Sequence, residues 1–308
     1  MAEHSHGKSY VEQAISVTSA RDQRIRDSWD RIVVPREIKS RLLNHALMAI
    51  ELRENGVAGI GLPLHGLLVL SGSPGVGKTS LARGLGSQVA EHLGDRYGPV
   101  RVLEVNLHVL PSELLGRTQR NIVQLFEEDL PNLAEEGPLV VVLDEVEALA
   151  VSRAQTSLEI NPADVFRGTA ALLSSLDWVS REVPSAVVVG TTNLPGAIDD
   201  AITSRTDLWL EVPMPSVPVI EEILADTFRE LGQWYPGCKA ILDSGRLAQV
   251  AELLEGTDGR QVRKFVADSL ALDVATALDP SKLTIEDMID FASSQPRRRV
   301  GGQRGVAL

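Results

Sequence analysis

An eight-residue glycine-rich motif constrains the fold of this chain more than any other feature of its sequence. The motif reads Gly72-Ser73-Pro74-Gly75-Val76-Gly77-Lys78-Thr79 and fits the pattern G-x-x-x-x-G-K-[ST]. A short apolar run at 66–70 precedes it, and a helical pattern follows it to about residue 93. In such a strand–turn–helix segment the glycines let backbone N–H groups turn toward phosphates, and the helix start adds its dipole. The motif therefore predicts a phosphate-binding loop at the end of a buried strand.

The residues of this loop and the serine that follows it are the candidate ATP-binding residues. They are Ser73, Pro74, Gly75, Val76, Gly77, Lys78, Thr79 and Ser80. Lys78 can reach the β- and γ-phosphates, and the Thr79 hydroxyl can bind Mg²⁺. A chance glycine-rich turn is the alternative, and the flanking strand and helix count strongly against it. The predicted cofactors are ATP and Mg²⁺.

Apolar, strand-like runs alternate with helical patterns on both sides of the loop. Helices are predicted from about 35 to 54, from the loop to 93, and at 119–135 and 163–178. Strands are predicted at 66–70, 100–106, 139–143, 186–191 and 207–212. Apolar strands that alternate with helices are typical of a parallel sheet covered on both faces. The pattern predicts an α/β fold with a parallel five-stranded sheet flanked by helices.

The pattern changes at Pro213-Met214-Pro215-Ser216-Val217-Pro218, where three prolines predict a stiff linker. Beyond it only helical periods occur, at about 217–231, 240–255, 260–277 and 284–292. The predicted organisation is therefore an N-terminal arm over 1–27 with room for one helix, a large α/β domain over 28–213, a small all-helical domain over 214–293, and a flexible basic tail over 294–308.

Polar side chains follow two of the predicted strands. Asp144 and Glu145 end the third strand, and Asn193 comes just after the fourth. A carboxylate beside the phosphate loop can hold the Mg²⁺ shell, which is the role expected of Asp144, and the next carboxylate can polarise a water for in-line attack. Asn193 could help place that water, although an asparagine after a strand is more often a turn residue. Glu147 is interpreted as a surface or network residue.

Composition and charge exclude several functional classes. Hydrophobic residues make up 44% of the chain, and 30 basic against 42 acidic residues give a net charge of −12. Such an acidic chain gains no affinity for nucleic acid from counterion release. The first 16 residues lack the apolar core of a signal peptide, and no apolar run is long enough to cross a membrane. We expect a cytoplasmic protein without an intrachain disulfide, since Cys238 is the single cysteine.

The order of these motifs, followed by a helical lid, resembles the AAA+ family of P-loop ATPases. The segment Asp199-Asp200-Ala201-Ile202-Thr203-Ser204-Arg205 is similar to the family segment that carries the arginine finger. By that resemblance Arg205 would reach the ATP of a neighbouring subunit in a ring. Gly259-Arg260 resembles the sensor-2 motif, so Arg260 would contact the γ-phosphate within its own subunit. A surface salt bridge is the alternative for each arginine.

Within that family, the sequence resembles the pachytene-checkpoint branch. The residues that carry it are Trp29-Asp30, Lys39, Leu42-Leu43, Pro74 to Leu81, Asp144-Glu145-Val146-Glu147-Ala148-Leu149, Asn193, Ile198-Asp199 and Arg205 with Asp207. The Asp-Glu-Val-Glu string and the missing Pro-Gly after the finger segment are the more specific cues. The resemblance implies a homohexamer that uses ATP to convert closed HORMA-domain proteins to open forms. Bacterial members are associated with anti-phage signalling, where they separate a HORMA protein from a nucleotidyltransferase.

Two departures from the branch pattern bear on how a client is held. Large aromatic residues of the family's pore loop are replaced by Leu114 and Leu115, which would have to grip the client. Burial in the core is an equally supported interpretation of these leucines. Only about 60 residues precede the first predicted strand, whereas eukaryotic members carry a large recruiting domain there. A short chain of this kind looks more like the bacterial members.

Two other functions remain open from the sequence. The first keeps the fold and changes the client, as in an AAA+ unfoldase or activase that acts on a protease partner or a metabolic enzyme. The second is a nucleotide-gated scaffold that binds ATP without turnover. Glu145, Asn193 and Arg205 together argue against the scaffold, because it needs no carboxylate to activate water.

Overall fold

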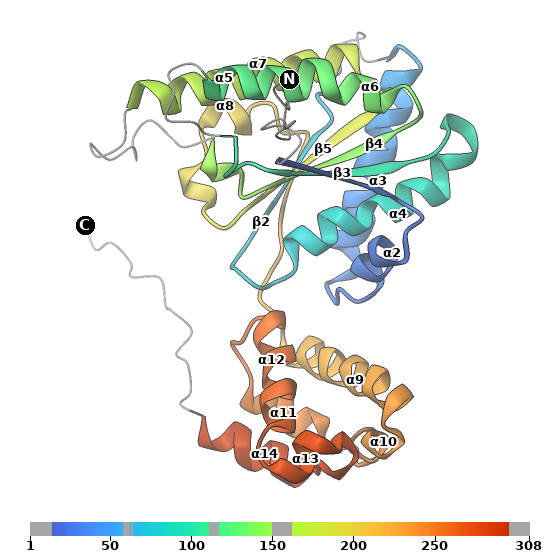
Figure 1. Ribbon diagram of the computed structural model, residues 1–308, viewed down its shortest axis with the longest axis vertical. Coiled ribbons are helices and arrows are strands. Elements are labelled where there is room, and N and C mark those ends of the chain that lie inside the picture. The colour runs from blue at the N-terminus through green and yellow to red at the C-terminus, as the bar shows by residue number, and fades with distance from the viewer. Residues whose placement is uncertain (1–13, 58–61, 63, 111–116, 150–161, 296–308) are drawn as a thin grey trace, which may run out of the picture. The chain divides into compact units, whose positions relative to one another are not determined.

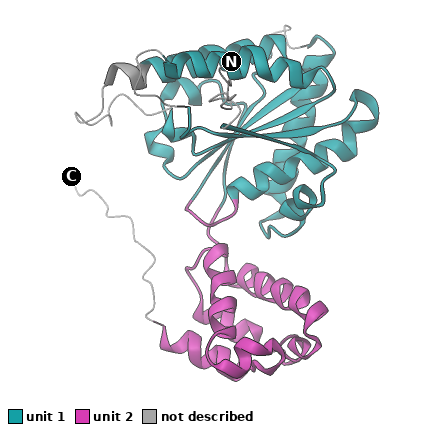
Figure 2. Cartoon of the chain, viewed as in Figure 1, with its two compact units in different colours: residues 1–72, 78–212 teal, residues 73–77, 213–308 magenta. Residues whose placement is uncertain are grey.

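The computed structural model describes residues 14–57, 62, 64–110, 117–149 and 162–295. The backbone divides into two compact units (Figure 2). One contains residues 1–72 and 78–212, and the other contains 73–77 and 213–308. Within the described residues, no helix is both long and apolar enough to cross a bilayer.

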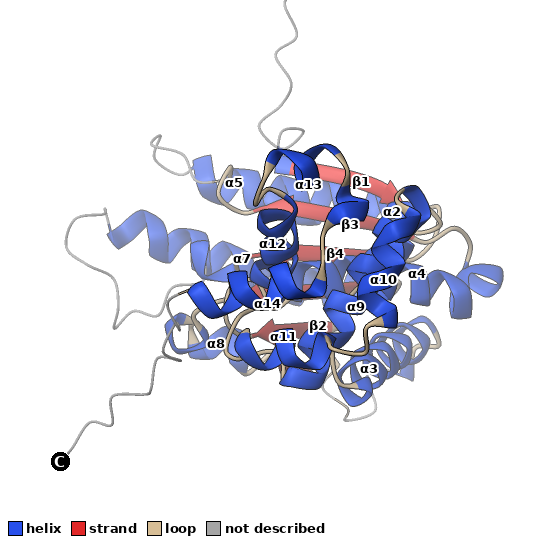
Figure 3. Ribbon diagram, turned by 90° about the horizontal axis from the view of Figure 1, so that it is seen from below, coloured by secondary structure: helices blue, strands red, loops and turns tan. Residues whose placement is uncertain are grey.

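The first unit is built on a six-stranded sheet with the order β1-β3-β4-β5-β2-β6. Figure 3 shows β1 at one edge, followed by β3 and β4. The strands are β1 (Ile15–Ser19), β2 (Leu67–Ser71), β3 (Arg101–Asn106), β4 (Leu139–Asp144), β5 (Ala186–Thr192) and β6 (Leu208–Glu211). Strands β2 to β6 pair in parallel, which confirms the predicted α/β sheet.

Strand β1 is an addition that the sequence did not predict. It lies in the segment expected to be an N-terminal arm and pairs antiparallel with β3, so that the sheet is mixed. Its sequence, ISVTS, is short, polar at alternate positions and only partly buried. It therefore lacks the largely apolar run by which the other strands were recognised, since an edge strand is not covered on both faces.

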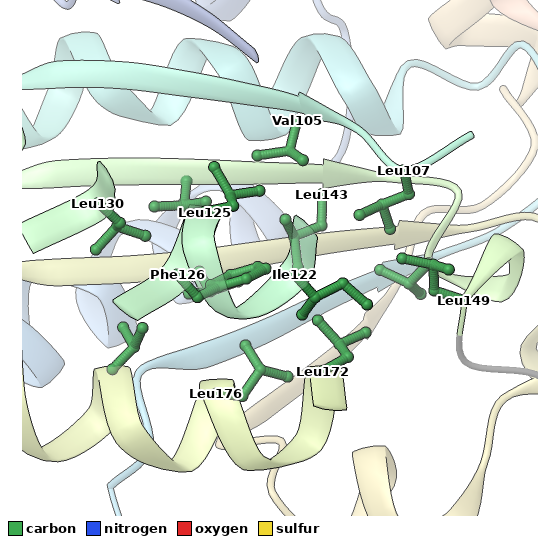
Figure 4. Close-up of a cluster of buried hydrophobic side chains, with 14 of the residues drawn as sticks. Val105, Leu107, Ile122, Leu125, Phe126, Leu130, Leu143, Leu149, Leu172 and Leu176 are labelled. Carbon is green, nitrogen blue, oxygen red and sulfur yellow. The ribbon is translucent and has the colours of Figure 1, made fainter. Parts of the chain in front are cut away.

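Helices cover both faces of this sheet (Figure 1). Helices α2 (Gln23–Asp30), α3 (Arg36–Glu54) and α4 (Lys78–Tyr97) lie on one face. Helices α5 (Arg117–Val123), α6 (Leu130–Ala134) and α7 (Pro162–Glu182) lie on the other, and the short α8 (Asp200–Thr203) precedes β6. Apolar side chains from β3, β4 and α5 to α7 form a buried layer between the sheet and the helices on this second face (Figure 4).

The helix predicted at 119–135 contains a π turn over Gln124–Asp129, where the Leu130 N–H donates to Leu125 O. Buried positions 118, 121, 122, 125 and 126 follow ordinary helical spacing, and buried position 130 comes one residue later than that spacing predicts. A π turn accommodates one extra residue and so brings both stretches onto the core face. Leu130 is fully buried there as a result.

Close packing of α2 against α4, the helix that follows the phosphate loop, depends on Gly84. A Cβ atom at this position would lie 2.5 Å from the backbone nitrogen of Trp29. Gly94, in the same helix, has room for a Cβ atom, whose nearest neighbour would be Arg21 Nη2 at 3.8 Å, an ordinary van der Waals contact.

We expect Gly84→Ala and Gly94→Ala to change stability in opposite directions. Alanine at 84 forces α2 away from α4, and overpacking of this kind costs about 1–3 kcal/mol. Alanine at 94 meets no obstacle and gains about 0.5–1 kcal/mol from the reduced entropy of the unfolded chain. Urea unfolding of the two variants measures the difference, and equal midpoints would contradict the close approach of the helices.

The second unit contains only helices and turns among its described residues. The α-helices are α9 (Val217–Trp234), α10 (Lys239–Asp243), α11 (Leu247–Leu253), α12 (Gly259–Leu270), α13 (Val274–Leu278) and α14 (Ile285–Ser294). Two of the helices expected from the sequence are each broken in two. Gly245, with φ of 65°, separates α10 from α11, and Asp273 begins α13 with a capping box.

Candidate functional site

The glycine-rich loop joins β2 to α4, and α4 begins at Lys78. Gly75 and Gly77 have φ values of 82° and 98°, which L-residues with a side chain rarely adopt. These two glycines allow the backbone to turn tightly before the helix starts. The sequence motif is therefore in the strand–turn–helix position that phosphate binding requires.

Lys78 links this loop to the end of β5. The residue is 6% exposed. The Lys78 ammonium donates to Gly72 O at 2.8 Å and to Asn193 Oδ1 at 2.7 Å. The structure thus brings together two predicted site residues that lie far apart in the chain. A cation held beside the glycine-rich loop is suited to bind phosphate oxygens.

Thr79 and Asp144, the predicted Mg²⁺ residues, are also in contact. The Thr79 hydroxyl donates to Asp144 Oδ1 at 2.7 Å, and the buried Thr191 hydroxyl donates to the same oxygen. Hydroxyl and carboxylate oxygens are the ligands that Mg²⁺ prefers in proteins. The donor set of Thr79 and Asp144 therefore fits this cation.

Glu145 follows β4 and is held at three points. Asn193 Nδ2 donates to Glu145 Oε1 at 3.2 Å, and His108 Nε2 lies 2.8 Å from Glu145 Oε2. The Glu145 backbone N–H donates to Thr191 Oγ1 at 3.2 Å. The Glu145 side chain is 45% exposed, so water can reach its carboxylate. A carboxylate next to the end of the phosphate loop is suited to activate water.

A cavity of about 440 Å³ adjoins this carboxylate on the side of β1 and β3. Its polar lining includes Asn106, His108, Asp144 and Glu145, and residues 14–16 form one wall. The unpredicted strand β1 therefore shapes the surroundings of the candidate catalytic residue.

Two residues of this network, His108 and Thr191, were not singled out from the sequence. Thr191 lies inside an apolar strand, and its hydroxyl at the carboxyl end of that strand was the only available signal. His108 lies two residues beyond β3 and carries no motif. Glu147 is a network residue as expected, because its Oε1 accepts the Asn193 backbone N–H at 3.0 Å.

Arg205 lies between α8 and β6, away from these contacts. Its Nε and Nη2 donate to the two oxygens of Asp177 at 2.7 and 2.8 Å, and Nη1 donates to Ala201 O. These hydrogen bonds hold the pKa of Asp177 below its usual range and raise the pKa of Arg205. Among the described residues, the Arg205 guanidinium contacts none of the other predicted site residues.

Arg260 belongs to the second unit, at the start of α12. Asp258 caps this helix by accepting the Gln261 N–H at 2.9 Å. The Arg260 backbone N–H donates to Gly75 O at 3.3 Å. The proposed gripping residues, Leu114 and Leu115, lie outside the described residues.

Comparison with known proteins gives a family and several relatives. Residues 68–214 match the model of the ATPase family associated with various cellular activities (AAA). The chain is 41% identical over 281 residues to CD-NTase-associated protein 6 of Pseudomonas aeruginosa, covering 91% of both chains. It is 32% identical to the pachytene checkpoint protein 2 homolog of Arabidopsis thaliana, over 77% of this chain and 48% of that protein. The chain thus spans about half the length of this plant relative.

Two solved structures share the fold. Caenorhabditis elegans PCH-2 matches with a TM-score of 0.73 at 21% identity, over 90% of this chain and 73% of that one. A chain of the E. coli MS115-1 HORMA:CdnC:Trip13 complex matches with a TM-score of 0.75 at 18% identity, over 94% and 98%.

Proposed function

Because this chain belongs to the AAA ATPase family, in the branch that includes the pachytene checkpoint proteins, we propose that it is an ATP-hydrolysing remodeller of a folded protein partner. The contact network around Glu145 is the observation that carries the hydrolytic part of the proposal. Asn193 joins Lys78 to Glu145, so that the cation for the phosphates and the carboxylate for the water are held by one side chain.

In this mechanism each of these residues of the first unit has a separate role. Lys78 binds the β- and γ-phosphates, and Thr79 and Asp144 hold Mg²⁺, which neutralises charge on the phosphate oxygens when bound. Asn193 orients a water molecule toward the γ-phosphorus. The Glu145 carboxylate accepts a proton as the water oxygen attacks, and the bond from that phosphorus to the β–γ bridging oxygen breaks to release ADP.

We propose further that the chain forms a homohexamer. Arg205 would then stabilise charge on the nucleotide of the neighbouring subunit, and Arg260 would contact the γ-phosphate of its own subunit. Arg205 is already held by Asp177 through two parallel hydrogen bonds, which fixes the plane of its guanidinium. Leu114 and Leu115 would grip the client in the central channel.

We propose a HORMA-domain protein as the client, together with a nucleotidyltransferase in an anti-phage system. Support comes from the similarity to CD-NTase-associated protein 6, which covers nearly the whole of both chains. The matched fold within the HORMA:CdnC:Trip13 complex agrees with this choice. Another client of the same kind of motor is the alternative.

Glu145→Gln should separate ATP binding from turnover and trap the client. Glutamine keeps the shape but cannot accept a proton, and loss of a general base typically costs 10²- to 10⁴-fold in rate. We expect ATP binding to remain and phosphate release to fall by about that factor. A HORMA-domain protein should co-purify with the variant in the presence of ATP. Exposed Glu255→Gln is the control and should resemble wild type.

Two results would contradict this proposal separately. Normal phosphate release by Glu145→Gln would show that Glu145 is not the base. Loss of turnover together with capture of a client of another fold would leave the motor intact and overturn the choice of a HORMA-domain partner.

A further inference from the structure

We propose that Thr191 is a positioning residue for hydrolysis, because its hydroxyl holds the backbone of Glu145 in the conformation that the reaction uses. This inference rests on the proposed role of Glu145 in activating water. Thr191 would touch neither the nucleotide nor the water. It would act through Asp144 and Glu145.

The backbone of Glu145 needs such support. Its φ of 53° and ψ of 60° lie in the left-handed region. Among the described residues it is the single non-glycine residue with a positive φ. A side chain makes this conformation unfavourable, and it persists only where surrounding contacts fix it. Glu145 is also the residue whose carboxylate must point at the attacking water, so this backbone angle bears directly on the proposed chemistry.

The Thr191 hydroxyl makes two bonds whose direction is unambiguous. A backbone N–H can only donate, so Thr191 Oγ1 accepts the Glu145 N–H at 3.2 Å. The single hydroxyl hydrogen is then directed to Asp144 Oδ1. Thr191 is 1% exposed, which leaves no access for water to replace either bond. One hydroxyl therefore joins the carboxylate expected to hold Mg²⁺ to the backbone of the expected base.

Strand β5 gives Thr191 a fixed position from which to do this. Thr191 pairs with Leu70 of β2, and the preceding Gly190 pairs both with Val69 of β2 and with Leu143 of β4. The hydroxyl is thus attached to the central strands of the sheet, whereas Glu145 begins the turn after β4. Because the strand is rigid, a hydrogen bond from it to the strained turn holds the backbone of Glu145 in a defined position.

Thr191→Val tests the proposal, because valine keeps the β-branched shape and removes both hydrogen bonds. We expect kcat for ATP hydrolysis to fall about 10- to 100-fold, as for a small misplacement of a catalytic group, while the affinity for ATP changes little. Thr191→Ser keeps the hydroxyl and should restore most of the rate. Thr169→Val is the matched control, since it removes a similarly buried hydroxyl bonded to Leu149 O and should leave kcat near wild type.

Hydrogen–deuterium exchange of the nucleotide-free protein provides a second measurement that does not depend on activity. The Glu145 amide should exchange faster in Thr191→Val and remain protected in Thr191→Ser and Thr169→Val. Unchanged exchange with unchanged kcat in a folded Thr191→Val protein would overturn the proposal, and so would a loss of rate that serine does not restore. Thr191→Ala, which is smaller, replaces the valine variant if that protein does not fold.

The outcomes are distinguishable from those for Glu145 itself. If Glu145→Gln hydrolyses ATP normally, the proposed function fails whatever Thr191 does. If Glu145→Gln is inactive and Thr191→Val has both the exchange and the kcat of wild type, only the positioning role of Thr191 fails.

Discussion

Lys78→Ala should abolish measurable ATP binding. Lys78 is buried, and its ammonium lies between Gly72 O of the loop and Asn193 Oδ1 at the end of β5. Removal of the cation leaves the triphosphate without its strongest positively charged partner in the loop. It also leaves two oxygens without their donor, in a site that must accept a highly charged anion.

Titration with a fluorescent ATP analogue measures this effect. Lys78→Met should lose binding equally, because methionine keeps the length of the side chain without the charge. Lys239→Ala, which removes an exposed cation from α10 of the second unit, should bind as wild type does. Wild-type affinity in Lys78→Met would show that the phosphate loop is wrongly assigned.

Arg205→Ala should keep ATP binding and lose turnover by about 10³-fold, which is the lower range for an arginine that stabilises transition-state charge from a neighbouring subunit. The effect on binding is small because the charge that the arginine meets develops only in the transition state. Steady-state phosphate release and ATP titration measure the two quantities.

The ion pair with Asp177 requires a control for folding. Asp177→Ala removes the pair and keeps the guanidinium, so it should lower the melting temperature about as much as Arg205→Ala. Its turnover should fall far less, because Arg205 remains available to the neighbouring subunit. Equal losses of turnover in both variants would indicate that the arginine acts through local structure.

Mixed rings provide an independent test of a shared site. Arg205→Ala subunits keep Glu145, and Glu145→Gln subunits keep Arg205. A mixed ring therefore contains interfaces with both groups intact, and mixing should restore part of the activity. ATPase activity that stays at the level of the separate variants across all mixing ratios would contradict action between subunits.

Local features of the sequence carried most of the fold prediction. The glycine-rich loop is contiguous, and five largely apolar strands alternate with helices, so neighbouring residues alone indicated the parallel sheet. Strand β1 and the π turn were missed for physical reasons. An edge strand is half exposed and needs no apolar run. A π turn shifts the spacing of the buried residues by one position, and a search for a single helical period does not detect that shift.

The sequence by itself was enough to predict the groups that would bind and hydrolyse ATP: the loop with Lys78 and Thr79, the carboxylates Asp144 and Glu145, and Asn193. These lie within motifs or at strand ends, where the parallel topology brings carboxyl ends to one edge.

The tertiary structure alone decided how these groups are held. The bonds of Glu145 to His108 and Thr191 join residues 37 and 46 positions apart, and the Arg205–Asp177 pair spans 28 positions. No periodicity or local motif encodes such contacts, because they depend on the register of β3, β4 and β5 in the sheet and on the packing of α7 against it. A buried hydroxyl in an apolar strand becomes a functional candidate only when its partners are known.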